Sequence, residues 1–204
     1  MYMWNPRERL VLASKSKVRR QLLEEAAIPF ACDSPNINER ELESGLLNHG
    51  GKSDELPAVL AQAKALDVSR RRPGALCLGA DQVLLLDGDI FHKAATVSEA
   101  EANLGQLLGR THLLLSAFAI ARNDQIIYCA QDSAAMTLRS LDPKQLACYL
   151  SCAGSDVLES VGGYMLEKSG VHLFKKIDGD HATILGLPML KVLSCLRREG
   201  ALLL

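Results

Sequence analysis

The sequence predicts an α/β fold in a single domain over residues 1–204. A short apolar run at 9–13 leads directly into a segment whose apolar residues have helical spacing, and strand-like runs recur near the middle of the chain, at 113–138. Hydrophobic residues make up 48% of the 204 positions, so a sizeable core can be buried. No internal repeat, low-complexity segment or inter-domain linker interrupts this pattern.

The first strand and the helix after it predict a phosphate site. The strand is expected over Arg9–Ala13 and the helix over 14–27, with Ser14 or Ser16 as its N-cap. Free backbone amides at the helix start are combined there with hydroxyls and cations: Ser14, Lys15, Ser16, Lys17, Arg19 and Arg20. The alternative is a surface helix with a solvated basic face.

The next segments are expected to be extended, then irregular, then helical. Two prolines hold 28–40 out of helix, and Glu39 ends this stretch as an exposed acid. The glycines and serines of 41–54 predict a mobile surface loop, and 55–72 predicts an amphipathic helix. Lys64 lies among alanines and leucines of that helix, so its side chain either reaches water along the apolar face or enters a cleft.

The stretch 75–93 places one carboxylate at the mouth of an apolar strand. Gly79 and Ala80 precede Asp81, and their small side chains allow the backbone or a ligand to approach closely. Asp87-Gly88 predicts a two-residue hairpin that returns Lys93 towards Asp81. An acid and a lysine at this place suit phosphate chemistry, since the acid holds metal or activates water and the lysine neutralises phosphate. The alternative is a turn aspartate and a solvated lysine.

The rest of the chain alternates strands and helices. A helix over 97–108 is expected to be capped by Ser98, and a helix is expected to begin at Asp142-Pro143. Three strands of an antiparallel meander, a further strand and a last helix complete the prediction: 113–122, 125–131, 133–138, 171–177 and the residues after Pro188.

Charge and cysteine content exclude several classes of protein. The 23 basic and 24 acidic residues nearly balance, so nothing in the overall charge favours nucleic acid or an anionic membrane. The six cysteines form no C-x-x-C pair and are expected to be reduced and structural. The first residues lack an apolar signal region, and no apolar run is long enough to span a membrane. We therefore expect a cytoplasmic protein.

Six short motifs, in order along nearly the whole chain, together resemble the Maf family of nucleoside triphosphate pyrophosphatases. Each motif is weak by itself, but their order is specific. They match the family patterns L-A-S-x-S, an acidic position, L-A-x-x-K-A, G-A-D-x-V, G-R-T-H and G-L-P at these places: Leu12–Ser16, Glu39, Leu60–Ala65, Gly79–Val83, Gly109–His112 and Gly186–Pro188.

The resemblance implies hydrolysis of a nucleoside triphosphate to the monophosphate and pyrophosphate. Asp81 falls on the family's proton acceptor, and Glu39 falls on a carboxylate expected near metal and water. A divalent cation, Mg²⁺ or Mn²⁺, would then lie at Glu39 and Asp81. The resemblance also implies a mixed sheet flanked by helices, two lobes around a nucleotide-binding cleft, and a homodimer. The substrate-binding positions it implies are Ser14, Val18, Arg19, Lys64, Gln82, Lys93 and Glu167.

Departures from the family pattern concern the nucleobase. Val18 stands where an arginine is usual, and Glu167 stands where many members have glutamine. Guanine presents two hydrogen-bond donors that a carboxylate can accept, and methylation at N7 adds a positive charge that a carboxylate favours. These features are similar to the 7-methyl-GTP pyrophosphatase branch, with the branch that prefers dTTP and UTP as the alternative. Glu167 could instead pair with Lys168 or Arg19 at the cleft rim.

Two functions from other classes compete with hydrolysis. The first is a nucleotide-binding regulator of cell division with little turnover. The carboxylate of Asp81 argues against this function, because a negative charge does not help to bind a polyanion. The second is RNA binding, which the balanced charge and the eight Phe and Tyr residues do not favour.

Overall fold

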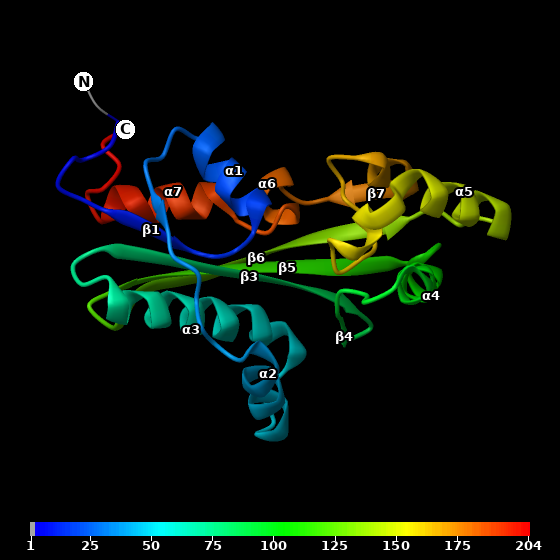
Figure 1. The fold of residues 1–204 in the computed structure, drawn as a ribbon, viewed down its shortest axis with the longest axis horizontal. Helices are drawn as coiled ribbons and strands as arrows, with labels where there is room; N and C mark the ends of the chain where they lie inside the picture. The colour runs from blue at the N-terminus through cyan, green and yellow to red at the C-terminus, as the bar shows by residue number, and fades with distance from the viewer. Residues whose placement is uncertain (1–2) are drawn as a thin grey trace. The chain divides into compact units, whose positions relative to one another are not determined.

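The computed structural model of the protein describes residues 3–204 and contains a mixed seven-stranded sheet with helices, which confirms the predicted α/β class. The strands follow the order β2-β1-β3-β5-β6-β7, and β4 pairs with β3 (Figure 1). The chain divides into two compact units. Unit 1 comprises the residues up to Gln82, Leu115–Asp132 and Asp180–Leu204, and unit 2 comprises Val83–Leu114 and Ser133–Gly179.

Unit 1 is built on parallel strands. β1 (Leu10–Ala13) pairs with β2 (Ala31–Cys32) on one side and with β3 (Leu76–Leu86) on the other, so that Ala13 lies opposite Gly79. All four residues of β1 are buried, as expected for a parallel strand covered on both faces.

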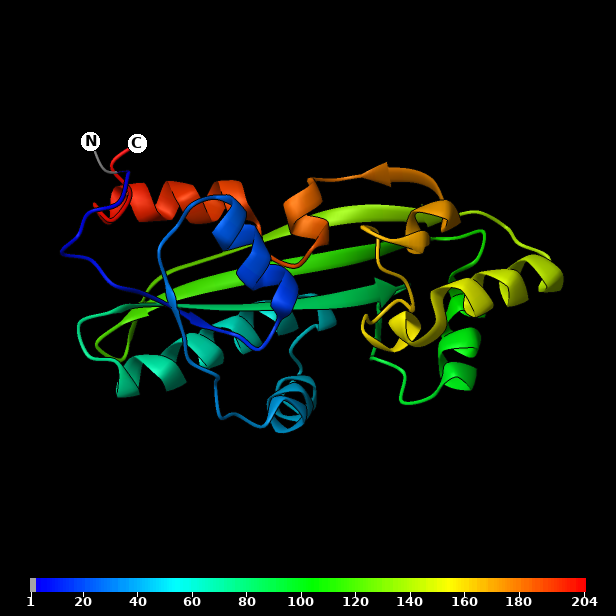
Figure 2. The same ribbon diagram turned by 45° about the horizontal axis from the view of Figure 1, so that its top comes forward.

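Helices cover both faces of the sheet in unit 1. α1 (Lys17–Glu25) and α7 (Met189–Arg198) lie on one face, and α3 (Leu56–Arg71) lies on the other (Figures 1 and 2). Alternate strand residues belong to separate core clusters, because successive side chains of a strand point to opposite faces. Leu78 and Ala80 pack with residues of α1 and α7, whereas Cys77 packs with Val68 of α3.

The prediction of an irregular loop over 41–54 is wrong, because the chain forms a helix, α2 (Glu39–Asn48), in most of this segment. Asn38 caps this helix by accepting a hydrogen bond from the Glu41 amide at 3.3 Å. Two glutamates in the first turn suit the positive end of the helix dipole. These starting signals outweigh the cost of Gly45 inside the helix.

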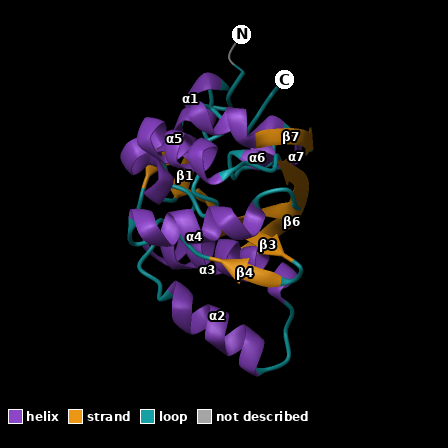
Figure 3. Ribbon diagram, turned by 90° about the vertical axis from the view of Figure 1, so that its right-hand side faces the viewer, coloured by secondary structure: helices purple, strands orange, loops and turns teal. Residues whose placement is uncertain are grey.

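Unit 2 contains β4 (Asp89–Phe91), α4 (Val97–Leu107), α5 (Pro143–Ala153) and β7 (Phe174–Asp178) (Figure 3). The helix α4 contacts α5. The cap of α4 is Thr96, whose hydroxyl accepts from the Glu99 amide at 3.2 Å, so the expected cap at Ser98 is wrong by two residues. Asp142 caps α5 as predicted, in a capping box with Gln145.

Two of the predicted strands form one long strand in the structure. β5 (Thr111–Arg122) is followed by a single strand, β6 (Gln125–Leu138), where two were expected. Asn123 and Asp124 connect them with φ of 52° and 61°, which fits the type I′ turn of a tight hairpin. The turn Asp87-Gly88 has φ of 53° and 95° and confirms the hairpin between β3 and β4.

Short helices complete the chain, at Ser53–Glu55, Gly154–Leu158, Ser169–Leu173 and α6 (His181–Ile184). The strand expected over 171–177 therefore begins only at Phe174, because the residues before it form a 3₁₀ turn. All six cysteines are free, but only Cys77 and Cys195 are buried, so the expected structural role does not hold for the exposed ones: Cys32, Cys148 and Cys152. Among residues 3–204 no helix is both long and apolar enough to cross a membrane.

Candidate functional site

Lys64 lies between two carboxylates. Its ammonium nitrogen is 2.8 Å from Oε1 of Glu39 and donates a hydrogen bond to Oδ1 of Asp81. Lys64 is only 6% exposed, so it enters the protein and does not extend to water. The two acids differ in environment, because the side chain of Glu39 is 53% exposed whereas that of Asp81 is 11% exposed.

Close packing of α3 on β3 brings Lys64 to Asp81. A Cβ atom added to Gly79 would lie 2.2 Å from the carbonyl oxygen of Ala61 and 2.6 Å from the amide of Ala65, both in α3. Only glycine permits this approach of helix and strand. Asp81 is two residues beyond Gly79 and points to the same face, where Lys64 extends from α3. Of the two small residues predicted to admit the backbone or a ligand, Gly79 admits the backbone of α3, whereas Ala80 packs on the other face of the sheet.

Arg19 is a half-buried cation of unit 1. Ser16, not Ser14, caps α1 through the Arg19 amide. The guanidinium of Arg19 donates to the carbonyl oxygens of Gly186 and Ala80, each at 2.8 Å, and to Oγ of Ser14 at 3.4 Å. Its Nη2 donates to no residue among 3–204 in the described hydrogen bonds, so this nitrogen is available to an anion.

The charges of Arg19 and the two acids act on one another. Burial lowers the pKa of Arg19 below its usual value, and the negative charges of Asp81 and Glu39 oppose this effect. Two carboxylates and two cations therefore balance within the site, which we call the charge cluster: Arg19, Glu39, Lys64 and Asp81. An incoming polyanion would find the two cations already ordered.

The two acids of the charge cluster are the candidate donors for a metal ion. Within residues 3–204 no group of three or more His, Cys, Asp and Glu side chains could hold a metal. Mg²⁺ is commonly bound by one or two carboxylates together with substrate phosphates, so Glu39 and Asp81 fit such an ion when a phosphate is present.

Gln82 points to the opposite face from Asp81. Its Nε2 lies 2.9 Å from Oγ of Ser116, 3.2 Å from the carbonyl oxygen of Thr183 and 2.9 Å from that of Ile184. Ser116 is on β5 and the two carbonyls belong to α6. Ser116 could not be predicted from the sequence, because a serine in an apolar strand belongs to no motif.

Each of the remaining predicted residues has surroundings of its own. Val18 is half-buried on α1, next to Arg19. Lys93 and Glu167 are exposed residues of unit 2, and their roles stay predictions. Lys168 pairs with Asp156, with both carboxylate oxygens at 2.9 Å, and not with its neighbour Glu167.

A buried histidine of unit 2 was not singled out from the sequence. His112 hydrogen-bonds the hydroxyl of Tyr164 at 2.5 Å through Nε2, and its Nδ1 has no partner among the described residues. Burial lowers the pKa of His112 to about 4 and raises that of Tyr164. The hydrogen bond between His112 and Tyr164 holds the loop that contains Tyr164, three residues before Glu167. Its signal in the sequence is the G-R-T-H motif, whose last residue is His112.

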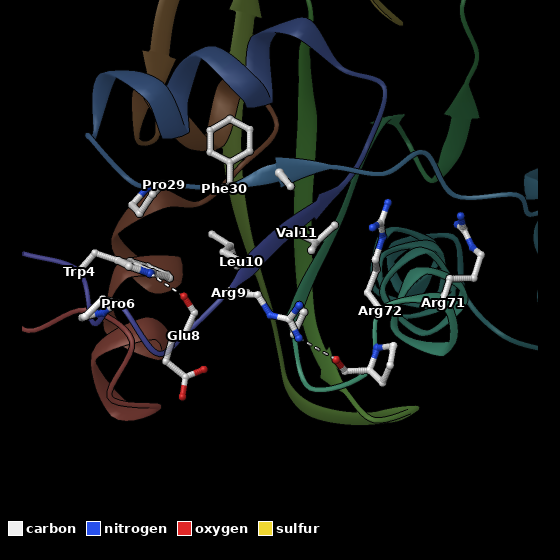
Figure 4. A pocket seen from close by; sticks show the side chains of 13 residues that line it. Trp4, Pro6, Glu8, Arg9, Leu10, Val11, Pro29, Phe30, Arg71 and Arg72 are labelled. Atoms are coloured by element: carbon white, nitrogen blue, oxygen red, sulfur yellow. Dashed lines mark hydrogen bonds between the residues drawn. The ribbon is translucent and has the colours of Figure 1, made fainter.

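A separate pocket opens in unit 1 at the start of β1 (Figure 4). None of the predicted site residues lines this pocket. Aromatic, proline and arginine side chains before β1, before β2 and at the end of α3 line it: Trp4, Pro6, Pro29, Phe30, Arg9, Arg71 and Arg72. The arginines are engaged by the protein, since Arg71 and Arg72 bind Asp33 at 2.7 Å each and Arg9 donates to the Pro73 carbonyl.

Comparison with known proteins matches this chain to curated bacterial proteins over nearly its whole length. A protein of Brucella abortus named 7-methyl-GTP pyrophosphatase is 44% identical, covering 94% of this chain and 96% of its own. A protein of the same name from Bartonella quintana is 47% identical over the same shares of the two chains. A protein of Rhodopseudomonas palustris named nucleoside triphosphate pyrophosphatase is 45% identical over 99% of each chain.

A solved structure of a HAM1 protein from Coxiella burnetii is similar over 73% of this chain and 99% of its own, with 16% identity and a TM-score of 0.43. The family model described as "Maf-like protein" matches residues 9–199. That match covers almost all of the chain, including every residue of the charge cluster. The chain therefore belongs to the Maf family.

Proposed function

We propose that this protein is a nucleoside triphosphate pyrophosphatase, which hydrolyses its substrate to the nucleoside monophosphate and pyrophosphate. The observation that carries the proposal is the charge cluster, in which one buried ammonium joins a buried and an exposed carboxylate beside a half-buried guanidinium. The names of the relatives, 7-methyl-GTP pyrophosphatase and nucleoside triphosphate pyrophosphatase, support the same reaction. The protein is accordingly a hydrolase acting on an acid anhydride.

The proposed reaction requires one proton acceptor and compensation of the triphosphate charge. Water attacks the α-phosphorus, the bond from that phosphorus to the bridging oxygen breaks, and pyrophosphate leaves with the electron pair. Asp81 accepts the proton from the attacking water. Lys64 and the free Nη2 of Arg19 neutralise phosphate oxygens, and Lys93 is proposed to do so from unit 2.

The substrate brings the metal ligands that the protein lacks. Glu39 and Asp81 are proposed to hold Mg²⁺ or Mn²⁺ together with phosphate oxygens, because two carboxylates are the usual protein share of such a site. When bound, the cation neutralises developing charge and makes the phosphorus a better electrophile. Glu39 can turn from Lys64 to the ion, since its side chain is 53% exposed.

The nucleobase is proposed to be a guanine, and 7-methylguanine in particular. Glu167 is exposed, and Lys168 is engaged by Asp156, so the carboxylate of Glu167 is left to accept from the N1 and N2 donors of guanine. The names of two relatives, 7-methyl-GTP pyrophosphatase, support this base. Hydrolysis of such a nucleotide would keep it from incorporation into nucleic acid.

The test is a substrate panel with pyrophosphate release as the readout. Wild-type protein is incubated with Mg²⁺ and 7-methyl-GTP, GTP, dTTP, UTP or CTP, beside Asp81→Asn and Glu167→Gln. We expect 7-methyl-GTP to have the highest kcat/KM, and Asp81→Asn to lose about 10²–10⁴-fold in kcat. Glu167→Gln should shift preference towards UTP and dTTP.

Each outcome of the panel has a distinct meaning. Leading activity on dTTP and UTP in the wild type would reject the guanine preference and leave the hydrolysis standing. Absence of pyrophosphate from every nucleotide, together with measurable nucleotide binding, would favour the regulator of cell division instead.

A further inference from the structure

The pocket at the start of β1 has the size of a small-molecule site. Its cavity of about 640 Å³ lies within the range of roughly 300–1,000 Å³ that ligand pockets occupy. Apolar rings lie on one side of Arg9 in Figure 4: Trp4, Pro6 and Pro29. Arg71 and Arg72 lie on the other side. The pocket therefore offers an apolar wall and a polar wall to one ligand.

The apolar wall is already fixed in the protein. The indole N–H of Trp4 donates to the carbonyl oxygen of Glu8 at 2.9 Å, and the backbone of Trp4 forms a bridge with Leu202. Trp4 also packs against the core cluster that contains Leu10, and Leu10 itself lines the pocket. An aromatic ring of a ligand would thus meet a flat surface that needs little further ordering.

Most charged side chains of the pocket are paired within the protein. Asp33 accepts from Nη1 of Arg71 and from Nε of Arg72, at 2.7 Å each. The carboxylate of Glu8 lies 2.6 Å from Nη2 of Arg122. These pairs compensate both the positive and the negative charges that line the pocket at these places.

Arg9 differs from the other arginines of the pocket. Among residues 3–204 its one described hydrogen bond runs from Nη2 to the carbonyl oxygen of Pro73 at 3.1 Å, and no described ion pair includes Arg9. Its Nε and Nη1 donors are therefore left to a ligand, and its charge lacks a carboxylate. One such cation balances the single charge of a carboxylate, whereas a phosphate group would bring nearly two charges.

We propose that this pocket binds a small molecule that joins an aromatic ring to a carboxylate, with the ring on Trp4 and the carboxylate on Arg9. The inference does not depend on the proposed function. The pocket lies at the start of β1, whereas Ser14, just after the other end of β1, accepts from Arg19 of the charge cluster. No residue of the charge cluster lines the pocket, so the two sites can be occupied together.

The first test uses the fluorescence of Trp4, the single tryptophan of the chain. The probes are 4-nitrobenzoate and 4-nitrobenzamide, which have the same shape, differ in charge and quench indole emission on contact. Quenching by 4-nitrobenzoate should saturate, with an affinity about threefold to tenfold higher than that of the amide, as for a charge-assisted hydrogen bond weakened by solvent. Quenching by 4-nitrobenzoate that never saturates, or equal affinity for the two probes, would overturn the proposal.

Two exposed arginines provide a variant and its matched control. Arg9→Gln should lower the affinity for 4-nitrobenzoate to that for 4-nitrobenzamide and leave the affinity for the amide unchanged. Arg7 is also exposed and lies two positions away, but it does not line the pocket, so Arg7→Gln should change neither affinity. Equal losses in the two variants would mean a general attraction of anions to this end of the protein, and the proposal would be rejected.

Competition distinguishes the pocket from the charge cluster. An excess of inorganic pyrophosphate should leave the Kd of 4-nitrobenzoate unchanged, and displacement of the probe would place it at the charge cluster and overturn the proposal. Acetate has the carboxylate without the ring, so it should compete only at concentrations at least about tenfold higher than those of 4-nitrobenzoate. In ¹H–¹⁵N spectra the one indole N–H signal should shift with 4-nitrobenzoate until it saturates. An unchanged indole signal would show that the ring does not lie on Trp4.

Discussion

A lysine shared by two carboxylates is the central residue of the charge cluster. Lys64 has lost its water, and the pairing with Asp81 and Glu39 compensates that loss. The pairing also leaves the two acids close to a cation that a phosphate can take over. A residue placed this way contributes both to stability and to substrate binding.

Removal of the lysine charge should leave a buried carboxylate without its partner. We expect Lys64→Met to lower the free energy of unfolding by about 3–5 kcal/mol at pH 7, because the largely buried carboxyl group of Asp81 loses its cationic partner. Adding Asp81→Asn to it should recover a large part of this loss. Urea unfolding of the two single variants and the double variant measures the coupling, and strictly additive losses would contradict a direct interaction. Lys64→Met should also raise KM for the nucleotide.

His112 makes the stability of the protein depend on pH. Its pKa is about 4 in the folded state because the ring is buried, compared with 6.5 as the ordinary value. The unfolded chain therefore binds this proton at a higher pH than the folded chain does. Stability should be complete above about pH 6.5 and should fall as the pH decreases towards 4, by at most about 1.4 kcal/mol per pH unit from this group.

The matched variant for this effect is His112→Gln, which can still hydrogen-bond Tyr164 but does not titrate. Urea unfolding at several pH values between 4 and 7 should show a weaker pH dependence in His112→Gln than in the wild type. Identical slopes in both proteins would mean that His112 is not the group responsible.

At the scale of elements, the contact of α3 with β3 decides the geometry of the charge cluster. The helix is close enough that Gly79 has no room for a side chain, and Lys64 extends from the same part of α3. A change in the distance between α3 and β3 would move Lys64 relative to Asp81. The packing of these two elements therefore affects the proposed catalytic site.

Gly79→Ala should act on both stability and turnover. The added methyl group would meet backbone atoms that cannot turn away, so we expect destabilisation of about 1–3 kcal/mol and a fall in kcat/KM. The matched control is Gly105→Ala in α4, where nothing lies within 4 Å of the added atom. Alanine should stabilise that helix by up to about 1 kcal/mol. Unfolding and kinetics on both variants test the contact, and an unaffected Gly79→Ala protein would contradict it.

At the scale of the whole molecule, a nearly neutral chain is proposed to bind a strongly anionic substrate. The net charge is −1, so binding must depend on local cations and on a divalent ion that arrives with the phosphates.

Metal removal should therefore abolish turnover without unfolding the protein. We expect an excess of EDTA to stop pyrophosphate release, and added Mg²⁺ or Mn²⁺ to restore it. The thermal unfolding midpoint of the nucleotide-free protein should change little, because two carboxylates bridged by Lys64 need no metal to be stable. Full activity in EDTA would contradict the metal requirement. The homodimer implied by the family resemblance stays a proposal, which light scattering on the purified protein can test.

The sequence by itself determined those features that depend on local pattern. Apolar periodicity and turn residues predicted a strand over 9–13, a helix over 55–72 and both hairpin turns, and the structure has these elements at 10–13 and 56–71, because these signals lie within a few residues. Motifs in order indicated the family. The sequence pattern did not predict α2, because the glycines at 45, 50 and 51 indicated a loop more strongly than the cap Asn38 indicated a helix.

Only the tertiary structure decided which side chains meet. The sequence left Lys64 between water and a cleft, and it is the approach of α3 to Gly79 that places this residue beside Asp81. Gln82 follows Asp81 directly in the chain but faces the opposite side of the sheet, towards Ser116, because successive strand residues alternate. Contacts between residues 17 or 34 positions apart depend on packing, and no local pattern in the chain carries that information.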